Sequence, residues 1–133
     1  MTIESANARA LVAAALDHAE TMGLAVSVAV LDSAGFLAAF GRGDEAKPYT
    51  VDVAIGKAYA VVFMGRSSAE IRDLAEKRPS FFGAVSELGR HTIIPSPGGV
   101  QVIGGAIGVS GAPNPDQDVE IASAAIEAVK GDA

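Results

Sequence analysis

The chain contains no cysteine and no tryptophan, and aromatic residues make up only 5% of its 133 residues. Without cysteine it has no disulfide, thiolate metal site or cysteine nucleophile. With so few rings, we expect a core built from close helix packing. Cations are scarce as well: 10 Lys and Arg against 16 Asp and Glu give a formal charge of −6. That balance argues against nucleic-acid binding, because phosphate contacts need a clustered basic face.

Long hydrophobic runs are also missing. No apolar stretch approaches the roughly 18 residues of a membrane span, and no basic segment precedes an apolar one at the N-terminus. We therefore expect a cytoplasmic protein that does not contact membranes. The length predicts one domain over residues 1–133.

Hydrophobic periodicity predicts the first half of the fold. Apolar residues from Ala8 to Met22 recur at helical spacing, which predicts a helix over 3–22 that ends at Gly23. The alternating residues 24–31, the turn Asp32-Ser33-Ala34-Gly35 and residues 36–40 predict a β-hairpin. The polar segment 41–48 is expected to be a loop.

The second half is expected to contain more helices and a further pair of strands. Ser67 and Glu70 form a capping box that starts a short helix, and Asn114-Pro115 starts the last helix. Gly104-Gly105 is expected to be the turn between two glycine-rich strands. The predicted helices are 50–64, 68–77, a short one capped by Ser80 and closed by Gly89, and a last one ending near Lys130; the strands are 100–103 and 106–110.

Residues 97–112 hold six glycines among Val and Ile. Glycine weakens a strand, so a strand that tolerates several usually has another backbone or a ligand against it. We expect Gly108 and Gly111 to expose backbone on a pocket wall. The spacing fits neither a phosphate loop nor a nucleophile elbow at Ser110.

Only two histidines are available for imidazole chemistry, His18 and His91. Their separation has no metal-site spacing, so we predict no metal site. His18 lies near the edge of the apolar stripe of the first helix, where it is either a partly exposed helix residue or a ligand for haem iron. His91 follows a predicted helix end, where a cation suits the helix dipole.

Four charged residues are expected to gather at loop-facing ends: Asp32, Arg42, Asp44 and Lys57. We expect Asp32 and Arg42 to flank the hairpin at the same end, with Asp44 in the loop that leads to the helix carrying Lys57. Such a group could bind a carboxylate or a propionate. The alternative is a surface charge cluster that contributes little.

The segments AVSVAVLDSAGFLAAFGRGDEA, IGKAYA, PGGVQV and GGAIGVSGA follow one another in an order that resembles the GlcG/HbpS haem-binding and haem-degrading family. The same domain occurs at the C-terminus of some PduO-type corrinoid adenosyltransferases. The resemblance implies an α+β, profilin-like fold, an antiparallel sheet flanked by helices in the order α-β-β-α-α-β-β-α. It implies a homo-oligomer and points to Asp32, Arg42, Asp44, Lys57, Gly98 and Gly99. The family's usual threonine is replaced by Ala60, and Gln101 stands where the family has proline.

The resemblance therefore implies a small-molecule-binding domain for haem or a related planar cofactor. A single His, Tyr or carboxylate could ligate the iron, and His18 and His91 are the histidines available. An alternative is a small enzyme or accessory protein of a catabolic operon, which acts on an organic acid held by Arg42 and Lys57. A third is an assembly factor without a ligand. The residues identify no reaction. The back of the first helix, Ala10, Ala13 and Ala14, is apolar. It either contacts another subunit or carries alanine simply because alanine favours helix.

Overall fold

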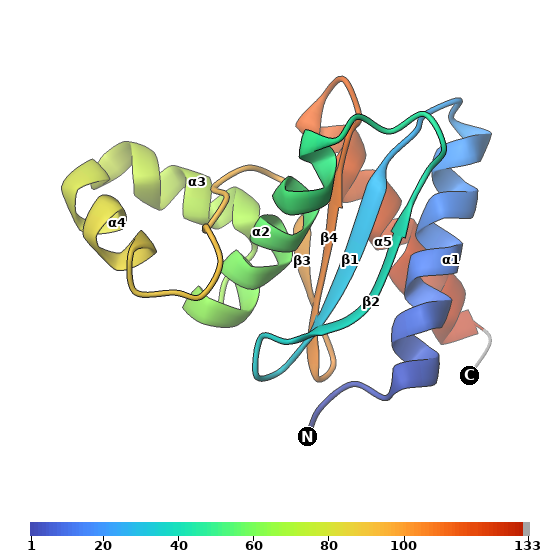
Figure 1. Ribbon diagram of the computed structural model, residues 1–133, viewed down its shortest axis with the longest axis horizontal. Helices are drawn as coiled ribbons and strands as arrows, with labels where there is room; N and C mark the ends of the chain where they lie inside the picture. Colours follow the sequence, from blue (N-terminus) through green and yellow to red (C-terminus); the bar gives the residue numbers. More distant parts are fainter. Residues whose placement is uncertain (132–133) are drawn as a thin grey trace.

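The computed structural model describes residues 1–131 as a four-stranded antiparallel sheet with helices on both faces (Figure 1). The strand order is β2-β1-β4-β3, so the two hairpins of the chain pair through their first and last strands. This confirms the expected α+β class. The elements are α1 Ser5–Thr21, β1 Ser27–Asp32, β2 Leu37–Arg42, α2 Tyr49–Met64, α3 Ser68–Lys77, α4 Pro79–Ser86, β3 Gly99–Val102, β4 Gly105–Ser110 and α5 Pro115–Gly131.

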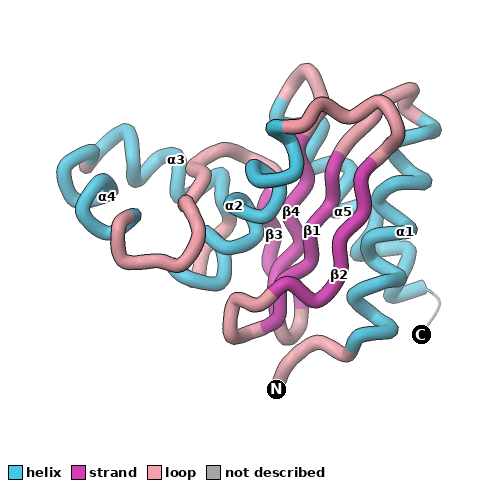
Figure 2. The backbone as a smooth tube through the Cα atoms, viewed as in Figure 1, coloured by secondary structure: helices cyan, strands magenta, loops and turns pink. Residues whose placement is uncertain are grey.

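The helices form two unequal layers (Figure 2). α1 and α5 lie side by side on one face of the sheet, and α2 covers the other face over β1, β4 and β3. α3 and α4 follow α2 and project away from the sheet, with only Arg78 between them. Because β1 and β4 are central and covered on both faces, their side chains are buried almost throughout.

Strand alternation divides the core into two clusters. Val28 and Val30 of β1 point toward α1 and α5, whereas Ala29 and Leu31 point toward α2. The apolar stripe predicted for α1 is confirmed, because Ala8, Leu11, Val12, Ala15 and Ala19 are all buried. On the back of that helix, Ala10 and Ala13 are exposed and Ala14 is partly buried.

The first turn forms as the residues predict. The Asp32 Oδ1 atom accepts hydrogen bonds of 3.0 Å from the backbone N–H groups of Ala34 and Phe36. Gly35 has φ +86°, a left-handed conformation that glycine adopts without strain. The second hairpin is displaced by one residue from the prediction: Val102 pairs with Gly105, so the turn is Ile103-Gly104 and Gly105 already belongs to β4.

The helix starts agree with the capping signals in two of three cases. The Ser67 Oγ atom accepts a hydrogen bond of 3.3 Å from Glu70 N, and Asn114 Oδ1 accepts one of 2.9 Å from Asp116 N. The predicted cap at Ser80 is wrong, because α4 begins one residue earlier at Pro79. Proline has no N–H to satisfy and its fixed φ suits the first helical turn.

Gly108 is buried beneath α2, so the expectation that it exposes backbone on a pocket wall is wrong. A Cβ atom at this position would collide with the carbonyl oxygen of Ala54 and lie 2.8 Å from the Ala58 nitrogen. The α2-facing residues of β4 are therefore Ala106, Gly108 and Ser110, all small. The glycine-rich strand allows the α2 backbone to lie directly on the sheet.

Candidate functional site

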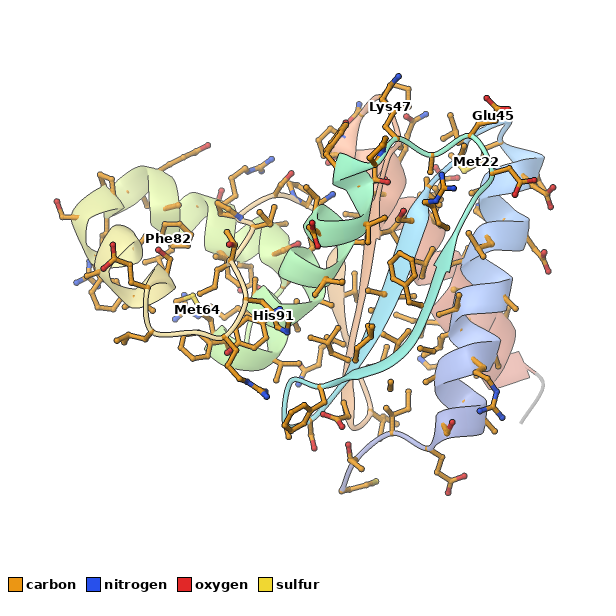
Figure 3. The ribbon with its side chains drawn as sticks, in the orientation of Figure 1. Met22, Glu45, Lys47, Met64, Phe82 and His91 are labelled. Atoms are coloured by element: carbon orange, nitrogen blue, oxygen red, sulfur yellow. The ribbon has the colours of Figure 1, made fainter. Side chains whose placement is uncertain are left out.

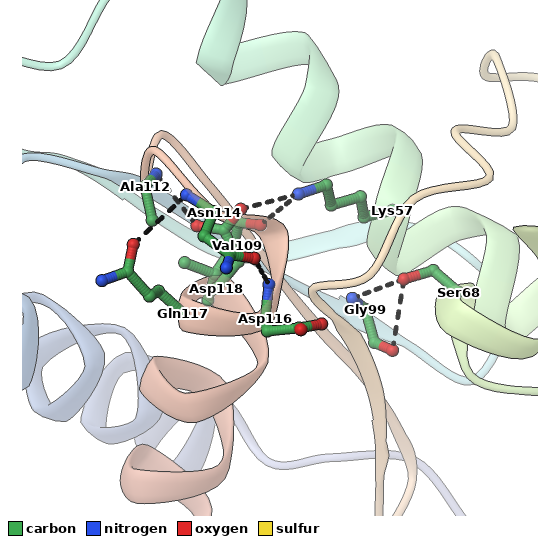
Figure 4. Close-up of polar contacts among 9 residues, drawn as sticks. All are labelled: Lys57, Ser68, Gly99, Val109, Ala112, Asn114, Asp116, Gln117 and Asp118. Atoms are coloured by element: carbon green, nitrogen blue, oxygen red, sulfur yellow. Dashed lines mark hydrogen bonds and ion pairs between the residues drawn. The ribbon is translucent and has the colours of Figure 1, made fainter.

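Three of the predicted site residues meet in a closed polar cluster beneath α2 (Figure 4). Lys57 projects from α2 toward the start of α5, where its Nζ lies 3.0 Å from Asp118 Oδ2 and donates a 2.9 Å hydrogen bond to the carbonyl of Val109. Gly98 lies against this pair, since a Cβ there would be 2.9 Å from Lys57 Nζ. Gly99 donates a 2.7 Å hydrogen bond from its N–H to Ser68 Oγ.

Burial dominates the electrostatics of this pair. The Lys57 and Asp118 side chains are 4% and 3% exposed. Burial lowers the pKa of the Lys57 ammonium and raises the pKa of the Asp118 carboxyl, and the attraction between the two groups opposes both shifts. Asp118 Oδ1 also accepts a hydrogen bond of 3.1 Å from Ala112 N. The ammonium therefore faces a carboxylate inside the protein and does not reach a surface ligand.

Arg42 lies apart from Lys57 and forms its hydrogen bonds within the loop that follows β2. Its Nη1 donates a 2.7 Å hydrogen bond to the carbonyl of Ala46 and a longer one of 3.4 Å to the carbonyl of Asp44. Within the described residues the Asp44 carboxylate makes no ion pair with Arg42. The side chain of Arg42 therefore holds the loop between β2 and α2 through backbone carbonyls.

Asp32 lies at the other end of the hairpin, so the expectation that it accompanies Arg42 is wrong. Ser27, at the start of β1, pairs with Arg42, whereas Asp32 ends β1 and caps the turn. In a hairpin, the end of the first strand is at the turn and the end of the second is at the open side. Asp32 and Arg42 are therefore five strand positions apart along the hairpin, a distance of roughly 17 Å.

His18 has an unusual environment between α1 and α5. Its Nε2 lies 3.8 Å from Glu120 Oε1, which is too far for a hydrogen bond. Among the buried side-chain nitrogen and oxygen atoms of residues 1–131, His18 Nε2 is the only one that has no hydrogen-bond partner. The side chain as a whole is 33% exposed. Buried polar atoms are nearly always paired, so this nitrogen is exceptional among the described side chains.

His91 lies in an aromatic group beside α2, where Figure 3 labels it. Its exposed ring meets the Tyr59 ring edge-on, with 5.1 Å between centroids, and Tyr59 stacks on Phe63 at 5.4 Å. Arg90 places its guanidinium 4.1 Å from the centroid of the Phe36 ring and donates its backbone N–H to the Tyr59 hydroxyl. These contacts fasten the segment after α4 to the first hairpin.

Two depressions on the described surface lie away from these residues. They have volumes of about 250 and about 270 Å³, and none of the eight predicted site residues lines either of them. Ligand pockets for small molecules usually enclose roughly 300–1,000 Å³. No group of three or more His, Cys, Asp or Glu within the described chain could hold a metal ion, and no helix there is long and apolar enough to cross a membrane.

Sequence reasoning missed Asp118, Ser68 and Glu120, the partners of Lys57, Gly99 and His18. Asp118 looks in the sequence like one of several acidic residues that suit a helix start. The available signal was the lysine, because a cation in the apolar stretch of α2 needs a buried counter-ion. That signal does not say which carboxylate supplies it.

Comparison with known proteins places the chain in a family. A family model described as "Haem degrading protein HbpS-like" matches residues 3–127. The search of curated proteins finds no significant match.

Solved structures show the same fold. Protein ORFY of Klebsiella pneumoniae is 29% identical with a TM-score of 0.87, over 98% of this chain and 92% of that one. A double mutant of Streptomyces reticuli HbpS is 30% identical with a TM-score of 0.82, over 95% and 86%. A structure titled as a PduOC:Heme complex is 26% identical with a TM-score of 0.83, over 96% and 95%. The sequence match and these structures agree, and the chain belongs to the HbpS-like family.

Proposed function

We propose that this chain is a haem-binding module, or binds a closely related planar cofactor, and that His18 contributes the iron ligand. The family model and the related haem complex support haem as the ligand class. The observation in this molecule that carries the proposal is the unpartnered Nε2 of His18.

The residues around His18 fit such a role. A neutral imidazole is a common axial ligand of haem iron. Leaving a buried imidazole nitrogen unpaired costs roughly 1–3 kcal/mol, which binding to a metal centre would recover. The ring is partly exposed, so rotation about its side-chain bonds can turn a nitrogen outward. Haem would supply an iron atom, and this imidazole nitrogen would be its ligand.

Glu120 is the carboxylate that accompanies His18. It is 59% exposed and 3.8 Å from the imidazole. It can orient the ring, or replace it as an oxygen ligand. Both residues project from neighbouring helices, so the layer of α1 and α5 fixes the distance between them.

We also propose that the protein is a homo-oligomer. Neither described depression is as large as a usual ligand pocket, so a flat ligand as large as haem needs a second surface to cover it. Several large apolar side chains are also exposed and are available for a contact with a second copy. They are Phe36, Leu37, Tyr49, Phe63, Phe81, Leu88 and Ile103.

Titration of the purified protein with haemin tests the proposal. We expect a saturable Soret band, shifted from that of free haemin, with a fixed number of haems per chain. A denatured sample of the same protein controls for unspecific adsorption. An absorbance that grows linearly with haemin and shows no shift, in a sample folded by circular dichroism, would reject haem binding.

A further inference from the structure

We call residues 66–88, which contain the two projecting helices, the helical arm. Its α3 part is anchored in the core through Ser68 and Ile71, which are buried, whereas α4 is loosely packed. α4 has no buried residue although it carries two phenylalanines. Phe81 is 43% exposed, and Leu88, just after α4, is 75% exposed. In Figure 1 the arm extends away from the sheet, and α4 packs on α3 rather than on the body. Apolar side chains held out in this way need a second surface to cover them.

The arm also presents cations. Arg66, Lys77 and Arg78 line the depression of about 250 Å³ beside Leu74. Within the described residues, none of the three forms an ion pair. Arg78 instead places its guanidinium 4.3 Å from the centroid of the Phe81 ring.

The two carboxylates at this depression have other partners. Asp73 Oδ1 lies 3.8 Å from Arg72 Nε, and Glu70 Oε1 accepts a hydrogen bond of 3.1 Å from Ser67 Oγ. The arm as a whole contains four cations and four carboxylates, in a chain of formal charge −6. All of the excess negative charge therefore lies outside the arm.

Much of that charge lies on the layer formed by α1 and α5. The two helices carry six carboxylates and two Lys or Arg residues. Asp17, Glu20 and Glu120 are exposed there. The arm is neutral overall, but its three cations without an ion pair and its exposed apolar side chains are complementary to this acidic helical surface.

We propose that the helical arm of one copy docks on the α1–α5 layer of a second copy. Its cations meet the exposed carboxylates of that layer, and Phe81 and Leu88 pack against the helices. The arm and the α1–α5 layer lie at opposite ends of the molecule (Figure 1), so the contact is head-to-tail, and a closed ring of copies uses every arm and every layer. Glu120 belongs to this layer and lies 3.8 Å from His18, so the docked arm lies next to His18. This inference rests on the proposed homo-oligomer and names the surfaces through which its subunits contact each other.

Sedimentation equilibrium of charge-reversal variants tests this contact. We expect Arg66→Glu/Lys77→Glu to weaken self-association by about tenfold or more, because like charges then face each other across the interface. Adding Asp17→Lys/Glu20→Lys should restore most of the lost affinity. Lys47→Glu, at an exposed cation outside the arm, is the matched control and should leave assembly unchanged.

A second pair of variants tests the apolar part. Phe81→Ser/Leu88→Ser should weaken assembly, whereas Ile103→Ser, at an equally exposed apolar residue in the β3–β4 turn, should not. Melting curves should stay close to wild type, since α4 buries no residue. A monomeric wild type would reject the homo-oligomer itself. An oligomer that is insensitive to the arm variants, or that the α1 reversal does not restore, would reject the arm contact alone.

Discussion

The Lys57 ammonium lies 3.0 Å from the Asp118 carboxylate, and both side chains are almost completely buried between α2, β4 and α5. The two residues come from opposite faces of the sheet. Lys57 also bonds the carbonyl of Val109 at the end of β4, and Asp118 bonds the N–H of Ala112 just beyond it. The pair therefore ties both helical layers to one end of the central sheet.

We predict strong coupling between these two residues. Lys57→Met or Asp118→Asn alone should each lower the free energy of unfolding by roughly 3–5 kcal/mol, because each leaves one buried charge without its counter-ion. The double variant should lose clearly less than the sum of the single losses. Urea denaturation of the four proteins measures this. Additive losses would show that the two charges do not interact.

The same double variant is the reference for a pH experiment. The pKa of Asp118 is raised above 3.8, so its contribution to stability falls as pH rises from 3.8 through its folded pKa. The pKa of Lys57 is lowered below 10.5, so its contribution rises with pH between its folded pKa and 10.5. The stability of wild type minus that of the double variant should therefore be lowest at intermediate pH. If this stability difference were instead highest at intermediate pH, the attraction between Lys57 and Asp118 would outweigh the cost of burying the two charges.

The glycine beneath α2 is expected to tolerate no side chain. Gly108→Ala would push a methyl group into the α2 backbone and should destabilise the protein by roughly 1–3 kcal/mol or more. Gly83→Ala in α4 is the matched control, since a Cβ there meets nothing within 4 Å. It should stabilise by roughly 0.5–1 kcal/mol, because alanine is the better helix former. Equal effects of the two changes in thermal melts would contradict this close packing.

Arg42→Ala is expected to lower stability modestly and to leave haem affinity unchanged. The side chain is exposed and donates to the carbonyl of Ala46 at 2.7 Å, a contact worth about 0.5–1.5 kcal/mol. Lys47→Ala in the same loop is the control, with no expected loss of stability. If Arg42→Ala instead abolished binding at unchanged melting temperature, Arg42 would be a ligand-binding residue, as its sequence context also allows.

The local signals in the sequence predicted local structure well. The turn at Asp32 and Gly35, the capping box at Ser67 and the helix start at Asn114 each depend on residues within a few positions. The second hairpin was displaced by one residue because two adjacent glycines both suit a turn. The fold distinguishes them, because Gly104 has φ +82° and accepts a hydrogen bond from Ile3 N, whereas Gly105 lies in β4 against the carbonyl of Leu31.

The candidate site was less predictable because its contacts are distant in sequence. Lys57 and Asp118 are 61 residues apart, and nothing local identifies one as the partner of the other. Asp32 and Arg42 lie at opposite ends of the hairpin, which the predicted turn and strands already implied, so this part of the error was avoidable. The burial of Lys57 on Asp118 depends on the placement of α5, which the sequence does not give. His18 was recognised from its helix position, but its unpaired Nε2 follows only from the placement of α5.

Haem titration of His18→Ala beside His91→Ala tests whether His18 is the iron ligand. Both substitutions remove one imidazole, and both side chains are at least partly exposed, so each variant should fold. We predict that His18→Ala shifts the Soret maximum or weakens haem binding, and that His91→Ala leaves the wild-type spectrum. A wild-type spectrum and affinity in His18→Ala would contradict the assignment of His18 as the iron ligand.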